Sequence, residues 1–245
     1  MSDVVWIVPC FNEENRLKIQ EFLLYAKEHQ VSFLFVNDGS TDKTLALLEY
    51  LKSESDFCHY LNLTQNLGKA NAIRQGVLYI QEKFPQFLYV GYLDADLATP
   101  LDQLEFLMTI IRENNFEMVI GSRVNLLGRT IQRRPMRHYL GRIFSTVVSI
   151  ILDLSIYDTQ CGAKIFKNTQ KLWKVFEKPF ISRWIFDVEI IQRYKKLYPE
   201  FCNKSKNSFI FEFPLYKWID IKGSKLRPWD FIQAIYELLL IKFSK

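Results

Sequence analysis

The sequence predicts an α/β fold in which helices flank a mostly parallel, doubly wound sheet. Short apolar runs of strand length alternate with helix-length segments along the first half of the 245-residue chain. The connections between them are short, which is typical of the βαβ units that build a parallel sheet. Clusters of polar residues follow the apolar runs, and the carboxyl ends of parallel strands are where such sheets bind ligands.

The expected elements of the first half follow one another without a linker. Apolar, β-branched and aromatic runs indicate strands at 4–8, 32–36, 60–63, 87–94 and 116–121. Polar openings and apolar spacing indicate helices from about 12 to 28, 42 to 52, 69 to 83 and 100 to 114. The pattern is less regular from Ser122 onward, so we expect a single domain, 1–245, with an elaborated C-terminal third.

The composition limits the class of protein. With 49% hydrophobic and 24% charged residues, the chain is globular and can bury a sizeable core. A net charge of +5 is too small for a general nucleic-acid binder. The cysteines are far apart and form no C-x-x-C pair, which favours reduced thiols over a zinc site or a disulfide framework: Cys10, Cys58, Cys161 and Cys202.

The chain shows no signal-peptide pattern at its start, and no run reaches the ~18 apolar residues that span a bilayer. We therefore expect a cytoplasmic protein that can still lie on a membrane surface.

Asp94 and Asp96 follow the strand expected at 87–94. Residues two apart face the same side of an extended chain, so both carboxylates can reach into one cleft. Two close carboxylates repel each other unless a cation lies between them, and hard oxygen ligands favour Mg²⁺ or Mn²⁺. The alternative is that the two residues cap the helix that starts at Pro100.

Two more polar clusters follow expected strands. Asp38 lies in a tight turn and can accept an N–H of a base or a ribose hydroxyl, or the turn and its cap can be purely structural. Gly68 and Lys69 stand where a helix begins, which favours an anionic phosphate. They do not form a P-loop, because Ala70 replaces the required Ser or Thr. We expect these clusters and Asp94 to converge on one cleft.

In combination, these motifs resemble glycosyltransferase family 2 of the GT-A fold. The matching stretches are VPCFNEE at 8–14, VNDGSTD at 36–42, NLGK at 66–69 and DAD at 94–96. Three further stretches resemble the dolichyl- or polyprenyl-phosphate glucosyltransferase branch: GSR at 121–123, DTQCGAKIF at 158–166 and WIFDVE at 184–189. Ala98 stands where related mannosyltransferases carry Gln, which favours the glucosyl branch.

The resemblance implies an inverting, metal-dependent hexosyltransferase. It would move glucose from UDP-glucose to a polyprenyl phosphate at the inner, cytoplasmic face of the membrane. The half 1–121 would bind the nucleotide sugar, and the half 122–245, with its C-terminal amphipathic helix, would bind the acceptor. The implied nucleotide-sugar contacts are Pro9, Phe11, Glu13, Asp38, Gly68, Lys69, Asp94, Ala95, Asp96 and Gln160.

The resemblance also implies roles for the charged residues. Asp96 and Asp94 would hold Mg²⁺ or Mn²⁺, which stabilises the leaving diphosphate, and Arg123 would add a bidentate phosphate contact. Relatives with hydroxyl acceptors use a carboxylate at the position of Asp187 as a general base. A phosphate acceptor is already anionic, so Asp187 can instead orient the acceptor or the sugar. The alternative for Asp187 and Glu189 is a strand that faces polar neighbours.

A segment that is basic and then apolar follows the expected strand at 116–121. No acidic residue occurs from 118 to 152, and an apolar run occupies 143–152. A basic cluster beside an apolar segment suits an anionic lipid head group at a membrane surface. Arginines 129 and 142 belong to the cluster, and we expect the acceptor phosphate to meet Arg123, Arg133, Arg134 and Arg137.

Several alternatives stay open. The run 143–152 can be a helix buried on the sheet, and 229–245 can dock on the domain, lie on a bilayer or join two copies of the chain. The enzyme can transfer to a sugar hydroxyl of a polysaccharide or glycolipid, and the chain can also be a non-catalytic nucleotide-sugar-binding module.

Overall fold

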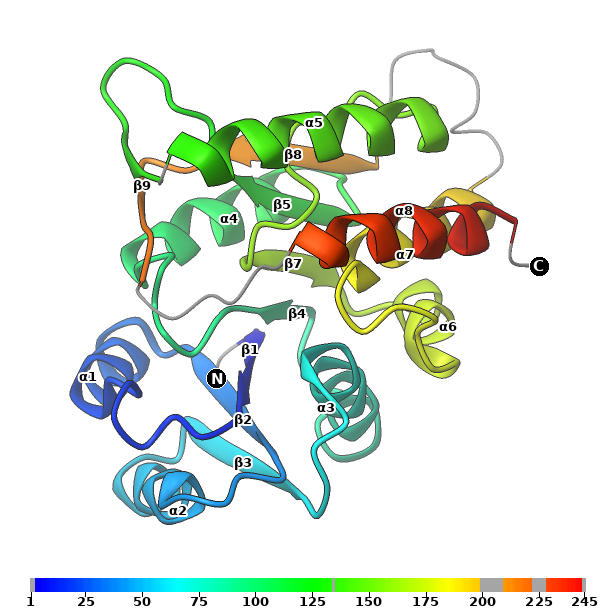
Figure 1. The fold of residues 1–245 in the computed structure, drawn as a ribbon. Helices are drawn as coiled ribbons and strands as arrows, with labels where there is room; N and C mark the ends of the chain where they lie inside the picture. The colour runs from blue at the N-terminus through cyan, green and yellow to red at the C-terminus, as the bar shows by residue number, and fades with distance from the viewer. Residues whose placement is uncertain (1–2, 134, 199–208, 222–227, 244–245) are drawn as a thin grey trace.

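A computed structural model describes residues 3–133, 135–198, 209–221 and 228–243 and confirms the predicted fold class. Its main sheet has seven strands in the order β3-β2-β1-β4-β7-β5-β8, and helices cover both faces (Figure 1). All pairings in this sheet are parallel except those of β7, which runs antiparallel to β4 and β5. A second sheet pairs β6 with β9.

The strands are β1 (Val4–Cys10), β2 (Ser32–Asp38), β3 (Cys58–Leu63), β4 (Tyr89–Tyr92), β5 (Met118–Ser122), β6 (Thr130–Gln132), β7 (Lys164–Lys167), β8 (Ile210–Pro214) and β9 (Lys217–Ile219). The helices are α1 (Ile19–His29), α2 (Thr44–Glu54), α3 (Lys69–Lys83), α4 (Asp102–Glu113), α5 (Pro135–Leu152), α6 (Gln170–Glu177), α7 (Phe186–Leu197) and α8 (Pro228–Phe243).

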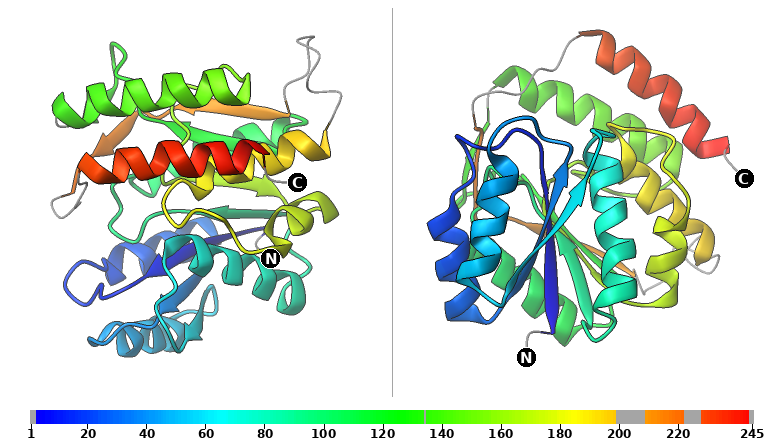
Figure 2. Two further views of the ribbon diagram at one scale, coloured as in Figure 1. Left: turned by 45° about the vertical axis from the view of Figure 1, so that its right-hand side comes forward. Right: turned by 90° about the horizontal axis from the view of Figure 1, so that it is seen from below.

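The core lies on both faces of the main sheet. Helices α1, α2 and α4 cover one face, and α3, α6 and α7 cover the other (Figure 2). Strand β1 contributes to both layers, because Val5 and Ile7 point to one side while Trp6 and Val8 point to the other. Burial on both faces explains why this strand is a continuous apolar run instead of an alternating one.

The first helix begins later than the sequence predicts. The polar residues at 12–14 form a loop instead of a helical turn, and they join the loop that follows β2. The Asn12 Oδ1 accepts a hydrogen bond from the Thr41 N–H at 2.9 Å, and the Glu13 N–H donates to Thr44 Oγ1 at 2.8 Å. Asn12 has a left-handed φ of 53°. Tertiary contacts thus use the polar groups that the sequence suggested would start a helix.

The C-terminal third differs most from a regular α/β pattern. Strand β7 was not predicted, because a four-residue strand with lysines at both ends carries almost no apolar signal. The run 143–152 lies in α5, where Phe144, Val148 and Leu152 pack on the core, so the buried alternative is correct for this side of the helix. The opposite side of α5 is exposed, as described below.

Helix α8 docks on the domain through its own apolar side. Ala234, Leu238 and Ile241 recur at helical spacing and are buried. Among the described helices, none is long and apolar enough to cross a membrane.

Candidate active site

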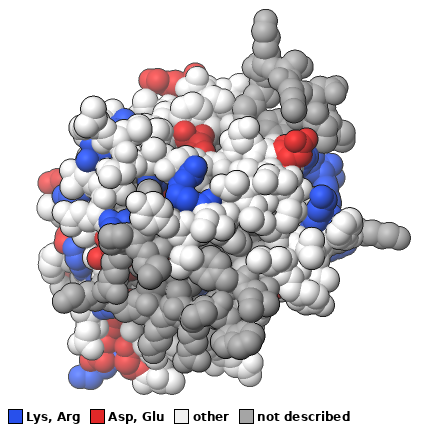
Figure 3. Space-filling model, turned by 45° about the horizontal axis from the view of Figure 1, so that its top comes forward, with Lys and Arg blue, Asp and Glu red and all other residues white. Residues whose placement is uncertain are grey.

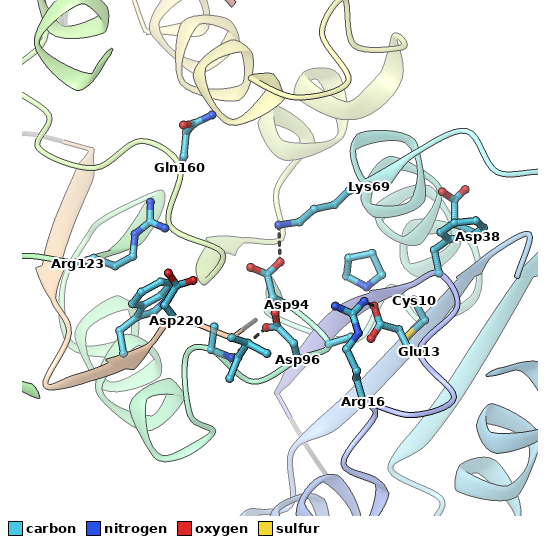
Figure 4. A pocket seen from close by; sticks show the side chains of 16 residues that line it. Cys10, Glu13, Arg16, Asp38, Lys69, Asp94, Asp96, Arg123, Gln160 and Asp220 are labelled. Carbon is cyan, nitrogen blue, oxygen red and sulfur yellow. Dashed lines mark hydrogen bonds and ion pairs between the residues drawn. The ribbon is translucent and has the colours of Figure 1, made fainter. Parts of the chain in front are cut away.

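A cleft of about 390 Å³ opens at the carboxyl ends of β1, β2 and β4 (Figure 4), a volume typical of small-ligand sites. The predicted convergence of the polar clusters on one cleft is confirmed. The lining residues are Pro9, Cys10, Phe11, Glu13, Arg16, Asp38, Lys69, Asp94, Ala95, Asp96, Ala98, Arg123, Gln160, Trp218, Asp220 and Ile221. Five of these carry a carboxylate and three carry a positive charge, so the cleft alone favours a cation.

Asp94 and Asp96 lie at the centre of the cleft, just beyond β4. They do not cap α4, which begins at Asp102. Burial raises the pKa of Asp96, and the neighbouring Asp94 carboxylate raises it further. The Lys69 ammonium forms an ion pair with Asp94. The remaining repulsion is of the kind that a bound divalent cation relieves.

Mg²⁺ or Mn²⁺ fits the chemistry of this cluster. Both aspartates offer hard oxygen ligands, and Glu13 Oε2 is buried in the same cleft without a hydrogen-bond partner in the described structure. Among the described residues, no group of three or more His, Cys, Asp or Glu side chains forms a complete metal site. A complete protein cage is not required, since Mg²⁺ is usually held by one or two carboxylates together with substrate phosphates.

Glu13 and Asp38 form one side of the cleft. Arg16 pairs with Glu13 at 2.6 Å and also lines the cavity. Asp38 is buried, and its carboxylate accepts the N–H groups of Leu67 at 3.0 Å and Gly68 at 2.7 Å. Asp38 therefore shapes the loop before α3, in addition to facing the cavity. Gly68 has a φ of 92°, which favours glycine, and is absent from the described lining residues.

Arg123 lies on the opposite side of the two aspartates from Glu13 and Asp38, near Gln160 (Figure 4). Its guanidinium pairs with both carboxylate oxygens of Asp158, at 2.6 and 2.7 Å, and stacks over the Trp218 ring at 5.2 Å. Burial opposes the charge of Asp158, but Arg123 prevails and lowers its pKa to about 2. The ion pair fixes the orientation of Arg123 at the cleft.

The other arginines have separate neighbours. The Arg129 guanidinium lies 3.3 Å from the Tyr216 ring centroid, and that of Arg142 lies 3.6 Å from the Tyr157 centroid. Each of these two guanidinium charges therefore has an aromatic ring as a neighbour, which stabilises it without a bound anion. Arg133 lies near enough to Asp158 to help lower its pKa.

Two of the expected acceptor-phosphate residues cannot be placed. Arg134 lies outside the described residues, and Arg137 belongs to α5 but its side chain lies outside the described part of the structure.

Asp187 and Glu189 lie in the first turn of α7, so the strand alternative is wrong. Ser182 Oγ accepts the N–H groups of Trp184 and Ile185, which lie just before this helix. Acidic residues are favourable in the first turn of a helix. Asp187 accepts hydrogen bonds from the Lys164 ammonium, at 2.5 Å, and from the Tyr92 hydroxyl. Glu189 instead pairs with Arg193 at 2.7 Å. Asp187 is absent from the described lining residues of the cleft.

Sequence reasoning missed four charged or aromatic residues of the site. Asp158 stands inside a quoted motif, but its bidentate pairing with Arg123 required the structure. Arg16, Trp218 and Asp220 carry no motif, and the last two reach the cleft only because β9 pairs with β6 and the Ile219 N–H donates to the Ala98 carbonyl.

Comparisons with known proteins give a consistent result. The family model described as Glycosyl transferase family 2 matches residues 5–176. A dolichyl-phosphate beta-glucosyltransferase of Trichomonas vaginalis is 32% identical, over 96% of this chain and 71% of its own length. The dolichyl-phosphate beta-glucosyltransferase of Saccharomyces cerevisiae is 30% identical, over 97% of this chain and 73% of its own length.

Solved structures agree on the fold. The glucosyl-3-phosphoglycerate synthase of Mycobacterium tuberculosis, in complex with Mn²⁺, uridine diphosphate and glucosyl-3-phosphoglycerate, has a TM-score of 0.66 and 14% identity. The match covers 98% of this chain and 79% of that one. The same enzyme in complex with Mn²⁺ and UDP-glucose also has a TM-score of 0.66. This likeness supports the GT-A fold.

Proposed function

Because the chain belongs to glycosyl transferase family 2, we propose that it transfers glucose from UDP-glucose to a polyprenyl phosphate of the dolichyl type. The observation that carries the proposal is the paired Asp94 and Asp96 facing Arg123 across one cleft, in a chain similar along 96% of its length to a dolichyl-phosphate glucosyltransferase. A non-catalytic binding module has no need of this charged arrangement.

The donor occupies the side of the cleft formed by β1, β2 and α3. Asp38, Pro9 and Glu13 surround the uracil and ribose, Phe11 and Ala95 shape the walls, and Gln160 faces the sugar. Gly68 acts from outside the lining, because its N–H donates to the Asp38 carboxylate. Lys69 contacts the diphosphate, because its ammonium pairs with Asp94 in the cleft and is thus close to the metal ligands. Asp96 and Asp94 would hold Mg²⁺ or Mn²⁺, which would act as a Lewis acid and stabilise charge on the leaving diphosphate.

The acceptor phosphate enters from the side of Arg123. An oxygen of the lipid phosphate attacks C1 of glucose as the bond from C1 to the diphosphate oxygen breaks, so UDP leaves and the anomeric configuration inverts. The phosphate oxygen is already anionic, and the step therefore needs no protein base. Arg123, oriented by Asp158, and Arg133, with Arg134 and Arg137, neutralise the acceptor. This division assigns the donor to 1–121 and the acceptor to 122–245.

The outer sides of α5 and α8 provide the membrane contact in this proposal. On α5, Tyr139, Ile143 and Ile150 are exposed by 67%, 62% and 74%, and on α8, Tyr236 and Phe243 are exposed by 63% and 75%. A helix on the surface of a soluble protein normally has a polar outer side. Exposed apolar side chains on the outer side therefore indicate a contact with a membrane or another protein. On the described part of the face shown in Figure 3, uncharged side chains predominate, and the charged side chains form small separate patches.

The surface sits beside the basic segment that contains Arg133 and Arg142, which suits an anionic bilayer at the cytoplasmic side.

The test offers the protein a panel of nucleotide sugars with a polyprenyl phosphate and Mn²⁺ or Mg²⁺, followed by identification of the lipid product. We expect glucosyl phosphoryl polyprenol from UDP-glucose only. A matched reaction supplies the unphosphorylated polyprenol and a panel of free sugars. Transfer to a sugar hydroxyl in place of the lipid phosphate would replace this proposal by the hydroxyl-acceptor alternative, and no turnover with any donor would favour the binding module.

A further inference from the structure

We propose that Lys164 is a positioning residue of this transfer: its buried ammonium fixes the segment 160–162 against the Asp94 carboxylate and uses Asp187 as its counter-charge. The inference rests on the proposed function and deepens it at the floor of the cleft. It assigns Asp187 to the support of the site and not to proton transfer.

The environment of Lys164 is unusual for a lysine. It begins β7, between β4 and β5, and its side chain is completely buried. The ammonium donates to Asp187 Oδ1 at 2.5 Å and to the Cys161 carbonyl at 2.7 Å, and it lies 5.3 Å from the Tyr92 ring centroid. Lysine is almost never fully buried unless it is paired, so the position depends on these partners.

The Cys161 carbonyl connects Lys164 to the cleft. Gln160, on one side of Cys161, lines the cavity. Gly162, on the other side, lies so close to Asp94 that a Cβ built there would be 2.0 Å from Asp94 Oδ2. The carbonyl that Lys164 binds therefore determines how closely this backbone approaches the carboxylate. A shift of the segment changes the position of Asp94 and Gln160 together.

Asp187 completes the arrangement from the other side. Its carboxylate accepts from Lys164 and Tyr92, and its field helps raise the pKa of Lys69, which burial alone would lower. Lys69 in turn pairs with Asp94. Positive and negative charges thus alternate from the buried lysine to the cleft floor. One oxygen of Asp187 already accepts two hydrogen bonds, and Asp187 is absent from the described lining residues of the cleft. These contacts fit a residue that holds its neighbours in place better than a residue that accepts a proton from the substrate.

Energetics favour a positioning role over a stabilising one. Burial of two charges costs desolvation energy that their attraction often fails to repay, whereas removal of one partner leaves an uncompensated buried charge. A neutral pair of similar shape can therefore be as stable as the ion pair. Replacement of both partners can therefore restore stability without restoring the position of the 160–162 segment, and the test can measure the two effects separately.

The test compares Lys164→Met with the double variant Lys164→Met/Asp187→Asn. Lys167→Met is the matched control, because Lys167 ends the same strand and its ammonium donates to Asn115 Oδ1 at the surface, at 2.7 Å. The measurements are the thermal unfolding midpoint, the affinity for UDP in the presence of Mn²⁺, and kcat and KM for polyprenyl phosphate. UDP affinity provides a measurement that does not depend on turnover.

We expect Lys164→Met to lower the unfolding midpoint and the double variant to recover it. In the folded double variant, kcat should stay reduced about 100-fold, the loss expected for a misplacement of about 1 Å, with a smaller change in KM for the lipid. Affinity for UDP with Mn²⁺ should fall about tenfold, since Asp94 is displaced. The control should match the wild type in all three measurements.

Two results would overturn the inference. Recovery of kcat and UDP affinity together with stability would show that the pair is only structural. An Asp187→Asn variant that has lost the acidic limb of the kcat–pH profile while it retains UDP affinity would show that Asp187 exchanges a proton. A wild-type protein that binds UDP but does not glucosylate the lipid would instead refute the proposed function, and UDP affinity would still test the positioning of Asp94.

Discussion

Asp94, Asp96, Asp158 and Asp187 share a residue type but have different partners. Asp94 pairs with Lys69, Asp96 accepts the Ala98 N–H at 3.0 Å, Asp158 pairs with Arg123, and Asp187 pairs with Lys164. The first two face the cleft, Asp158 orients a cation that lines it, and Asp187 pairs with a buried cation behind it. Replacement of each carboxylate should therefore have a distinct effect.

Asp96→Asn should reduce transfer by on the order of 100-fold and weaken the affinity for UDP in Mn²⁺, because one charge is removed from a hard-cation site. The matched control is Asp102→Asn, an exposed carboxylate at the start of α4. Calorimetry with Mn²⁺ and with a chelator measures the binding. Full activity of the wild type in a chelator would contradict the metal role.

The ion pair of Asp158 makes stability depend on pH in the acidic range. The pKa of Asp158 is lowered from 3.8 to about 2 in the folded state, so the unfolded chain binds the proton more readily. The resulting stabilisation, about 2 kcal/mol, is present above pH ~4 and is lost as pH falls through about 2. Asp158→Asn should remove this part of the pH dependence, as measured by chemical denaturation at several pH values.

An equal pH dependence of unfolding in the wild type and in Asp158→Asn would show that the pair contributes nothing to stability. Activity should also fall in this variant, since Arg123 loses its bidentate partner.

Helices α5 and α8 illustrate how one element can serve two surfaces. Their inner sides pack on the core through Phe144 and Leu238, while their outer sides expose Ile143 and Tyr236. Helical spacing places the inner and outer residues on separate faces of each helix. In the proposed function these outer faces contact the bilayer, and that contact requires no change to the core.

Ile143→Ser/Tyr236→Ser should reduce binding to anionic phospholipid vesicles several-fold and raise the apparent KM for the lipid acceptor, while UDP affinity stays unchanged. The apolar area available for insertion is smaller in this variant, and insertion energy scales with that area. The matched control is Leu24→Ser/Tyr50→Ser, which removes an aliphatic and an aromatic residue that are 59% and 44% exposed on α1 and α2. Equal vesicle binding of the two double variants would exclude this face as the membrane contact.

At the scale of the whole molecule, the cleft joins distant parts of the chain. Loops after β1, β2 and β4 meet Arg123, Gln160 and the segment that contains Trp218. A ligand that contacts all of them links the two halves of the sheet, and binding to the native state alone stabilises the protein.

UDP with Mn²⁺ should therefore raise the thermal unfolding midpoint. At about 100 times Kd the stabilisation is about 2.7 kcal/mol, a shift of a few degrees for a chain of this size. Scanning calorimetry measures the shift, and a chelator should abolish most of it. An equal shift with UDP in chelator would mean that Asp94 and Asp96 bind the nucleotide without a cation.

The sequence by itself determined the fold class, the order of most elements in the first half and the residues of the cleft that follow β1, β2 and β4. Apolar periodicity and short connections act locally, and parallel strands bring their carboxyl ends to one edge whatever the details of packing. For this reason the strand pattern alone assigns Asp38, Lys69 and Asp96 to one cleft, whereas Pro9 is assigned to it by the family resemblance.

Only the tertiary structure decided what each charge meets. Contacts between residues far apart in the chain decide four features of the fold. These features are the late start of α1, the insertion of β7, the position of Asp187 on a helix and the position of Trp218 at the cleft. The pairing of Arg123 with Asp158 spans 35 positions and that of Lys164 with Asp187 spans 23. No local pattern encodes such pairs, because their free energy depends on burial and geometry that exist only after the sheet has formed.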